Sequence, residues 1–140
     1  MKKREVVITH AVRTAIGTRD GSLRDASSNE LASCVFRAII DRSGIDPALV
    51  DGVLMGQTKP STRPMNVARY AWLDAGLPES VPASTSYRAC CSGVQSIFDA
   101  VQTIAYGDAD IMIAGGVDSL NKSVYNSDQK QDSVRPNLSF

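Results

Sequence analysis

Short apolar runs alternate with longer amphipathic segments along most of this chain. Runs rich in β-branched and other apolar residues predict strands at residues 6–9, 50–56, 81–87 and 111–114. Between them, apolar residues recur at helical spacing, which predicts a helix capped by Ser27 or Ser28 and stopped at Gly44, a second from about Met65 to Gly76, and a third from near Cys91 to Gly107. The order of elements is therefore βαβαβαβ.

Each predicted helix has one apolar face that we expect to be buried. The faces consist of Leu31, Cys34, Val35, Ala38 and Ile39; of Val67, Ala68, Ala71, Trp72 and Ala75; and of Val94, Ile97, Phe98, Val101, Ile104 and Ala105. Cys34 is thus expected in the core. The run at 111–114 is apolar throughout, which is typical of a central strand buried on both faces.

This order of elements predicts an α/β fold, with a mainly parallel sheet covered by helices on both faces. Residues 1–120 form the expected domain, and the polar residues 121–140 form a tail or the start of a loop region. In open sheets of this kind, active sites lie at the carboxyl ends of strands, where a strand leads into a helix.

Composition and charge remove several classes of partner. Fifteen basic and fifteen acidic residues balance, so no net field attracts nucleic acid or an anionic membrane. No apolar stretch approaches the roughly 20 residues that span a bilayer, and the first apolar run is too short for a signal peptide. Three cysteines, two of them adjacent, suit a reducing compartment, so we expect a cytoplasmic protein without nucleic-acid or membrane partners.

The candidate chemistry lies where the third predicted strand leads into the third helix. Cys90 is placed close to the N–H groups of a helix start, which favour the reactive thiolate form, and Arg88 adds positive charge nearby. Backbone N–H groups of this turn can hold the oxyanion formed when a thiolate attacks a thioester. Gly93 permits a close backbone approach, and Ser92 can cap the helix. Alternatively, Cys90 and its neighbour Cys91 are small buried residues without a chemical role.

Other candidate residues carry weaker signals. We expect His10 to be structural and Arg13 to be a structural ion-pair partner, not a phosphate ligand. Gly115-Gly116 matches neither the P-loop nor the dinucleotide pattern and is expected to form a tight strand-to-loop turn. The three cysteines and the single histidine lack the spacing of a structural zinc site, so no metal site is predicted.

Several motifs, in order along the chain, resemble the thiolase family over about residues 5–120. They are residues 7–17 followed by Gly21-Ser22-Leu23; Ile45-Asp46-Pro47 before Val50-Asp51 and Gly56; Asn66-Val67-Ala68-Arg69 before Ala75-Gly76-Leu77-Pro78; Cys90-x-Ser92-Gly93; and Gly107-Asp108-Ala109-Asp110 with residues 114–119. The resemblance implies a thiolase-like N-terminal domain that is incomplete relative to the full family fold.

The resemblance also implies an acyl-CoA C-acyltransferase. Cys90 corresponds to the nucleophile that accepts an acyl group from one CoA thioester and passes it to a second acyl-CoA or to CoA, with its own N–H as an oxyanion donor. Acyl-CoA and CoA are then substrates, and no separate cofactor is implied. The chain departs from the family at Tyr87, usually asparagine, and at Cys91, usually glycine or alanine. Cys91 is an alternative nucleophile, but the Ser92-Gly93 register favours Cys90.

The family's other catalytic groups, a C-terminal histidine and cysteine, correspond to positions beyond residue 140. We therefore expect a complementary thiolase C-terminal chain, in a homo- or hetero-oligomer, to supply the base and the acid, with residues 81–87 at an intersubunit contact. An open sheet edge or apolar face should remain. The alternative is a catalytically inactive, truncated thiolase-like domain with a structural or binding role. A ketosynthase-type condensing enzyme is disfavoured by Arg13-Thr14 and residues 107–119.

Overall fold

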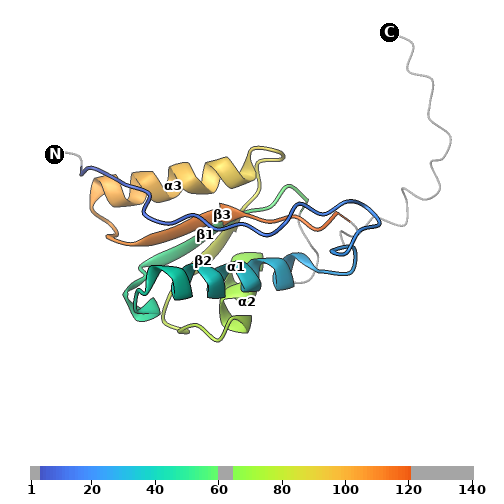
Figure 1. The fold of residues 1–140 in the computed structure, drawn as a ribbon. Helices are drawn as coiled ribbons and strands as arrows, with labels where there is room; N and C mark the ends of the chain where they lie inside the picture. Colours follow the sequence, from blue (N-terminus) through green and yellow to red (C-terminus); the bar gives the residue numbers. More distant parts are fainter. Residues whose placement is uncertain (1–3, 60–64, 121–140) are drawn as a thin grey trace, which may run out of the picture.

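The structure is a computed structural model that describes residues 4–59 and 65–120. In chain order its elements are α1 (Ser28–Ser43), the short 3-10 helix η1 (Pro47–Leu49), β1 (Gly52–Gly56), α2 (Val67–Asp74), β2 (Ala83–Ser86), α3 (Ser92–Tyr106) and β3 (Met112–Gly116) (Figure 1). The three helices and the last three strands predicted from the sequence are confirmed; β1 and β2 are shorter than predicted, and β3 begins one residue later and ends two residues later than predicted. The polar tail predicted at 121–140 lies outside the described residues.

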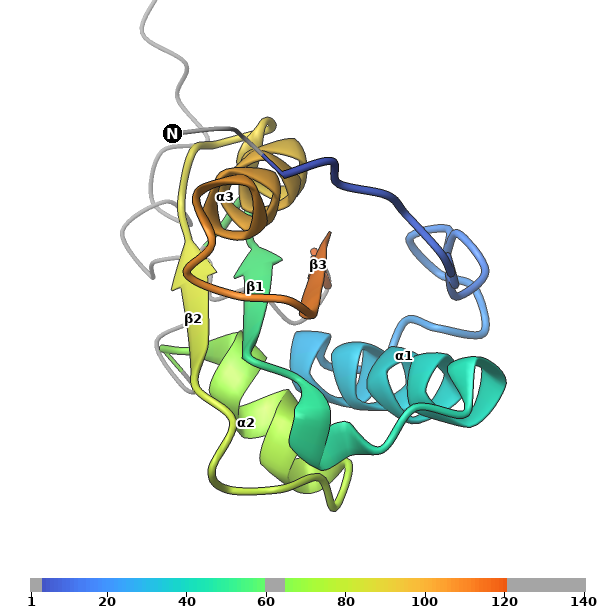
Figure 2. The ribbon, with the colours of Figure 1, turned by 90° about the vertical axis from the view of Figure 1, so that its left-hand side faces the viewer.

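The three strands form one parallel sheet in the order β2-β1-β3. Val53 of β1 pairs with Ala83 on one side and Ile113 on the other, and its side chain is fully buried. In Figure 2, α3 covers one face of the sheet while α1 and α2 lie on the other, which confirms the α/β layered fold. Within the described chain β3 pairs only with β1, so the prediction of a central, doubly buried strand there is wrong: β3 is an edge strand and is half-buried.

The predicted first strand is absent. Residues 4–18 adopt no regular secondary structure, and they run alongside β3 in the same direction without pairing to it (Figure 1). The N–H of Arg4 donates to the carbonyl of Ala105 at 3.2 Å near the start of this segment. Val7 and Ile8 are 69% and 77% exposed. An apolar run becomes a strand only when a partner lies about 4.8 Å away, and here a cavity separates the segment from β3.

The main core lies between α1, α2 and β1. The ring of Phe36 meets that of Trp72 edge-on, with centroids 5.7 Å apart, and the indole N–H of Trp72 donates to the carbonyl of Pro78 at 2.8 Å. Because α1 turns Ala32 and Phe36 toward α2, Cys34 points away and is exposed, so its predicted core position is wrong. The buried core residues are Ala32, Phe36, Val50, Val53, Met55, Val67, Ala68, Ala71, Trp72 and Val81.

Local signals set the helix ends. Ser27 and Glu30 form a reciprocal capping box at the start of α1. Gly44 and Gly107 follow α1 and α3 in the left-handed conformation, with φ of 67° and 89°, as expected for glycine after a helix. Asn66 caps α2 by accepting from the N–H of Arg69 at 3.1 Å, so α2 begins two residues later than predicted.

The face of α3 that contacts the sheet differs from the face that the sequence predicts to be buried. Its buried residues are the small Ser92, Ser96 and Ala100, which face the sheet. Val94 and Phe98, members of the predicted buried face, are each 57% exposed. Small side chains allow the helix backbone to approach the strands closely, which leaves the larger apolar side chains on the outside.

Candidate active site

The turn between β2 and α3 presents two thiols. Cys90 and Cys91 are both exposed, so the alternative interpretation is wrong in placing them in the core; their chemical role stays a prediction. Ala89, directly before Cys90, has φ of +48°, in the left-handed region that non-glycine residues seldom occupy. Such strain persists only where the surrounding structure holds it in place, and it commonly occurs at functional turns.

Ser92 holds this strained turn. Ser92 is buried, with 1% of the residue exposed. Its hydroxyl accepts a hydrogen bond from the N–H of Arg88 at 2.7 Å and donates one to the carbonyl of Ala89 at 2.7 Å. The predicted helix cap by Ser92 is therefore wrong, because Ser92 is already the first helical residue. Cys91 is the cap position, and its side chain makes no capping hydrogen bond. The start of α3 next to Cys90 thus lacks a side-chain cap of its own.

Arg88 is anchored along the helix. Its guanidinium donates to the side-chain carbonyl of Gln95, and the amide of Gln95 donates to Asp99 at 2.6 Å. This chain of hydrogen bonds fixes a positive charge beside the first turns of α3. Its effect on the thiol of Cys90 stays a prediction.

Glycines bring the strand ends and the helix start into backbone contact. A Cβ atom at Gly56 would lie 2.1 Å from the carbonyl carbon of Ser92, and one at Gly116 would lie 3.0 Å from the Cα of Gly93. A Cβ atom at Gly93 itself would lie 3.6 Å from the Cα of Gly116, an ordinary contact distance, so the glycines that this close approach requires are Gly56 and Gly116, not Gly93 as predicted. The tight turn predicted at Gly115-Gly116 is wrong, because both residues are paired in β3. Because Gly116 has no side chain, β3 can lie close to the start of α3 at Gly93.

Two aspartates that the sequence analysis missed join the strand ends. Asp118 accepts from the N–H groups of Thr58 and Lys59 at 3.1 and 3.2 Å, which ties the exits of β1 and β3 together. At the opposite end of the sheet, Asp51 accepts from the N–H groups of Asp110 and Ile111 at 2.7 and 3.0 Å. The hydrogen bonds from Ile111 and Asp110 lower the pKa of Asp51 below its ordinary value.

Asn66 is a further residue that the sequence analysis missed. Besides capping α2, its side chain donates to the carbonyl of Ala83 at 2.9 Å and accepts from the hydroxyl of Thr85 at 2.9 Å. It thereby fixes β2, and with it the approach to the Cys90 turn. An asparagine directly before an apolar helical pattern was the signal that could have identified it.

Tyr87, one of the two departures from the family pattern, bridges β2 and the start of α2. Its hydroxyl donates to the carbonyl of Met65, and partial burial raises the pKa of Tyr87 above its ordinary value. The position thus has a structural contact in this chain.

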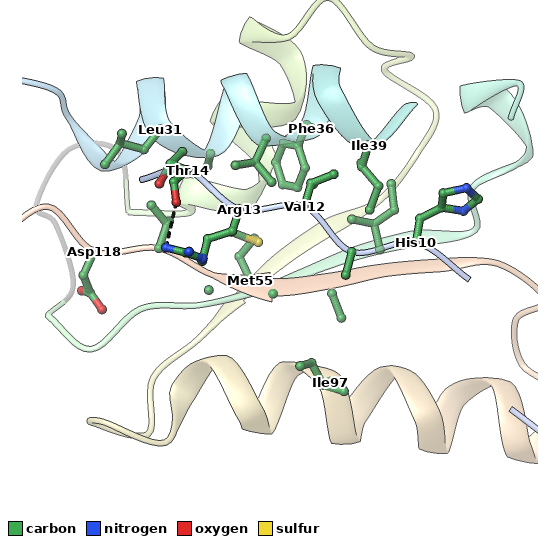
Figure 3. Close-up of a pocket in the computed structure, with 18 of the residues that line it drawn as sticks. His10, Val12, Arg13, Thr14, Leu31, Phe36, Ile39, Met55, Ile97 and Asp118 are labelled. Atoms are coloured by element: carbon green, nitrogen blue, oxygen red, sulfur yellow. Dashed lines mark hydrogen bonds between the residues drawn. The ribbon is translucent and has the colours of Figure 1, made fainter. Parts of the chain in front are cut away.

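Arg13 lines a large cavity between the N-terminal segment and β3 (Figure 3). Its guanidinium donates to the carbonyl of Thr14 at 3.1 Å. The ion pairs found in residues 4–59 and 65–120 join Arg4 to Asp110 and Arg24 to Asp25, so the predicted ion pair of Arg13 is not formed there.

His10 is not brought to the thiols. Figure 3 places it at the opposite end of the cavity from Asp118. Asp118 binds the exit of β1, and that exit packs against Ser92 beside the Cys90 turn. His10 is the only histidine of the chain, so the candidate site contains a positioned cysteine and no imidazole base.

Neither a metal cluster nor a membrane-spanning helix is found in the part of the chain that the structure describes. No three His, Cys, Asp or Glu side chains there gather closely enough to hold a metal ion. None of the described helices combines the length and the apolar character needed to cross a bilayer.

Comparisons with known proteins agree on one family. The model of the thiolase N-terminal domain matches residues 6–137. The acetyl-CoA acetyltransferase of Allochromatium vinosum is 42% identical over 130 residues, which is 93% of this chain and 33% of that protein. The beta-ketoadipyl-CoA thiolase of Pseudomonas aeruginosa is 44% identical over 126 residues, or 87% of this chain and 31% of that protein. The crystal structure of the Bacillus anthracis acetyl-CoA acetyltransferase superimposes with a TM-score of 0.86 at 37% identity, covering 99% of this chain and 35% of that one. The chain thus spans about one third of the length of these relatives.

Proposed function

This chain belongs to the thiolase family, whose N-terminal domain it carries, and from that premise we propose that it is the nucleophile-bearing part of an acyl-CoA C-acyltransferase. The observation that carries the proposal is the exposed thiol of Cys90, on a strained turn at the carboxyl end of β2 and the start of α3. The names of the relatives make acetyl-CoA the first substrate to test.

In the proposed step the Cys90 thiolate attacks the thioester carbonyl of an acyl-CoA. A bond forms between the Cys90 sulfur and the acyl carbon, the bond from that carbon to the CoA sulfur breaks, and the CoA thiolate takes up a proton. Backbone N–H groups at this turn, including that of Cys90, stabilise the oxyanion of the tetrahedral intermediate. In the second step the bond between the Cys90 sulfur and the acyl carbon breaks, and that carbon bonds either to the sulfur of CoA or to the α-carbon of a second acyl-CoA. A base of the complementary portion takes the proton from the attacking thiol or α-carbon, and Cys90 leaves as the thiolate.

A complementary thiolase portion supplies the base and the acid in this proposal. Cys90 has no imidazole beside it, because the single histidine lies at the far end of the cavity. The chain spans about a third of its relatives' length, which is compatible with catalytic groups outside it. Activation of a thiol requires such a base.

Assembly into an oligomer is part of the same proposal. β2 is the outer strand of the sheet in the described chain, so one of its edges is free to meet another subunit. Residues 81–87, which include β2, are the proposed contact, and they lead directly into the Cys90 turn.

Intact mass spectrometry after exposure to acetyl-CoA tests the proposal. With the complementary portion of a thiolase present, wild type is expected to gain one acetyl group. Cys90→Ala is expected to lose it and Cys91→Ala to retain it. Loss of the adduct only in Cys91→Ala would assign the nucleophile to Cys91. No adduct on any variant, in a complex that forms, would instead support the catalytically inactive, structural alternative.

A further inference from the structure

Two thiols stand at consecutive positions on the turn that leads into α3. Cys90 and Cys91 are both free and exposed, and the only other cysteine of the chain is Cys34. Position 91 departs from the family pattern, which usually has glycine or alanine there. The proposed acyl transfer uses the sulfur of Cys90 alone. The second thiol is therefore a feature of this chain that the proposed function leaves without a role.

The backbone around the two thiols is fixed by hydrogen bonds. The N–H of Cys91 donates to the carbonyl of Arg88 and the N–H of Ser92 donates to the carbonyl of Ala89, each at 3.1 Å. Cys91 has φ of −93° and ψ of 2°, values typical of the third residue of a type I turn. The buried hydroxyl of Ser92 bonds to both ends of the same turn. Two thiols on a fixed backbone lose little freedom when both bind one ligand.

The spacing of these thiols disfavours a direct disulfide. Consecutive Cα atoms lie about 3.8 Å apart across a trans peptide bond, whereas a disulfide joins Cα atoms roughly 4.4–6.8 Å apart. A bond between the Cys90 and Cys91 sulfurs would therefore be strained. An atom bonded to both sulfurs avoids this strain, because the sulfurs then do not need to approach to the S–S bond length of about 2.0 Å.

The number of donors limits the kind of ligand. A structural zinc ion takes four protein ligands, and within residues 4–59 and 65–120 no three His, Cys, Asp or Glu side chains gather around a common point. Two adjacent thiols instead suit a thiophilic centre that needs only two bonds from the protein. A trivalent arsenic atom that carries one organic group has two such bonds to offer, and both can be made to sulfur.

We propose that Cys90 and Cys91 form a chelating site for a trivalent arsenical bearing one organic group. With phenylarsine oxide as the probe, the arsenic–oxygen double bond breaks and two arsenic–sulfur bonds form. The two thiol protons leave with the oxygen as one molecule of water, and no atom is oxidised or reduced. The adduct occupies the sulfur of Cys90 and so blocks its acylation. Chelation needs only the two thiols and does not depend on the proposed acyl transfer.

Intact mass spectrometry of the full chain, treated with one equivalent of phenylarsine oxide, tests the site. Wild type is expected to gain one phenylarsenic group and lose two hydrogens. Because a chelate resists single thiols, this adduct should persist in excess 2-mercaptoethanol and be removed by the dithiol 2,3-dimercaptopropanol. Cys90→Ser and Cys91→Ser, which exchange one exposed sulfur for oxygen, are each expected to hold the probe at least about tenfold more weakly in 2-mercaptoethanol.

Cys34→Ser is the matched control. Cys34 is also exposed, but it lies on α1, across the sheet from α3, between Ser33 and Val35 (Figure 2). This variant should keep the adduct of wild type. An adduct that resists 2-mercaptoethanol equally in Cys91→Ser and wild type would overturn the chelate, and so would loss of the adduct in Cys34→Ser. The acetylation of Cys90 is measured separately without the arsenical, so either proposal can fail alone.

Discussion

Gly56 lies against the backbone of Ser92 so closely that a methyl group at Gly56 would stand 2.1 Å from the Ser92 carbonyl carbon. Gly56 ends the central strand and Ser92 begins the helix that follows the Cys90 turn. The position of the thiol is therefore fixed by contact between two main-chain segments that are far apart in the sequence.

Gly56→Ala should destabilise the fold and displace the Cys90 turn. Because the obstructing atoms are backbone, strand and helix must separate, and we expect a loss of at least about 3 kcal/mol in the free energy of unfolding, the upper end of ordinary overpacking. Urea denaturation measures it. Gly52→Ala is the control, since its new methyl crowds the flexible end of Met112 while the nearest backbone atom, the carbonyl oxygen of Pro82, lies at an ordinary 3.8 Å; it should cost less than about 1 kcal/mol. Equal losses in both variants would contradict the argument.

Ser92→Ala should loosen the strained turn at Ala89. The N–H of Arg88 loses its acceptor and the carbonyl of Ala89 loses a donor, which should cost about 1–3 kcal/mol of stability. The alkylation rate of Cys90 by iodoacetamide, followed by peptide mass spectrometry, should change relative to that of the exposed Cys34.

The control for this variant is Ser96→Ala, which removes an equally buried hydroxyl that bonds to the carbonyls of Gly93 and Gly115. It should leave the ratio of Cys90 to Cys34 alkylation near that of wild type. An unchanged ratio in Ser92→Ala would show that the Ser92 hydroxyl does not position the thiol.

Phe36→Ala should remove a central contact of the α1–α2 core. Phe36 is 1% exposed and meets Trp72 edge-on, so the free energy of unfolding should fall by about 3–5 kcal/mol. The fluorescence of Trp72, the only tryptophan, should shift to longer wavelength in the folded state as water reaches the indole. Phe98→Ala, at a site 57% exposed, is expected to change stability by less than about 0.5 kcal/mol. A similar loss at Phe98 would mean that α3 is covered in the isolated chain.

Asp51 should make stability depend on pH in the acid range. Hydrogen bonds from Ile111 and Asp110 hold the folded pKa below the ordinary value of about 3.9, so the unfolded chain takes up the proton first. This contribution is complete above about pH 4 and is lost as the pH falls through the folded pKa.

Asp51→Asn should therefore show a smaller fall in the free energy of unfolding between about pH 6 and about pH 3 than wild type does. The exposed Asp41, on the outer side of α1, gives the matched control Asp41→Asn. If the free energy of unfolding falls equally with pH in wild type and in Asp51→Asn, Asp51 does not contribute to the pH dependence of stability.

The sequence predicted the elements that depend on local signals. Ser27 with Glu30, and the glycines at 44 and 107, mark helix ends through interactions within a few residues. The prediction of a strand at residues 6–9 was wrong because a strand also needs a pairing partner, and a cavity lies beside this segment in the described chain. The prediction of the buried face of α3 was wrong for a related reason. It was based on hydrophobicity alone, whereas the small residues Ser92, Ser96 and Ala100 form the face that contacts the sheet.

The residues of the candidate site likewise fall into those that local sequence signals identified and those that they did not. Cys90 was identified from its place at a strand-to-helix junction and from its neighbours Ser92 and Gly93. Asp118 was not, because it acts on backbone groups at residues 58–59, distant in sequence. Asn66 carried a local signal as the cap of α2, but its hydrogen bond to the carbonyl of Ala83 did not. Nothing in the local pattern around them indicates which strand ends meet.

The backbone contacts of Gly56 and Gly116 with the start of α3 limit which residues can be exchanged around the Cys90 turn. Main-chain atoms are the same for every residue, so a thiol located by main-chain contacts keeps its place while side chains elsewhere are exchanged. Side chains around the turn are then free to vary in size and polarity, whereas Gly56 and Gly116 admit no larger residue without moving the backbone. The place of the Cys90 thiol and the identity of the side chains around it are thereby placed under separate constraints.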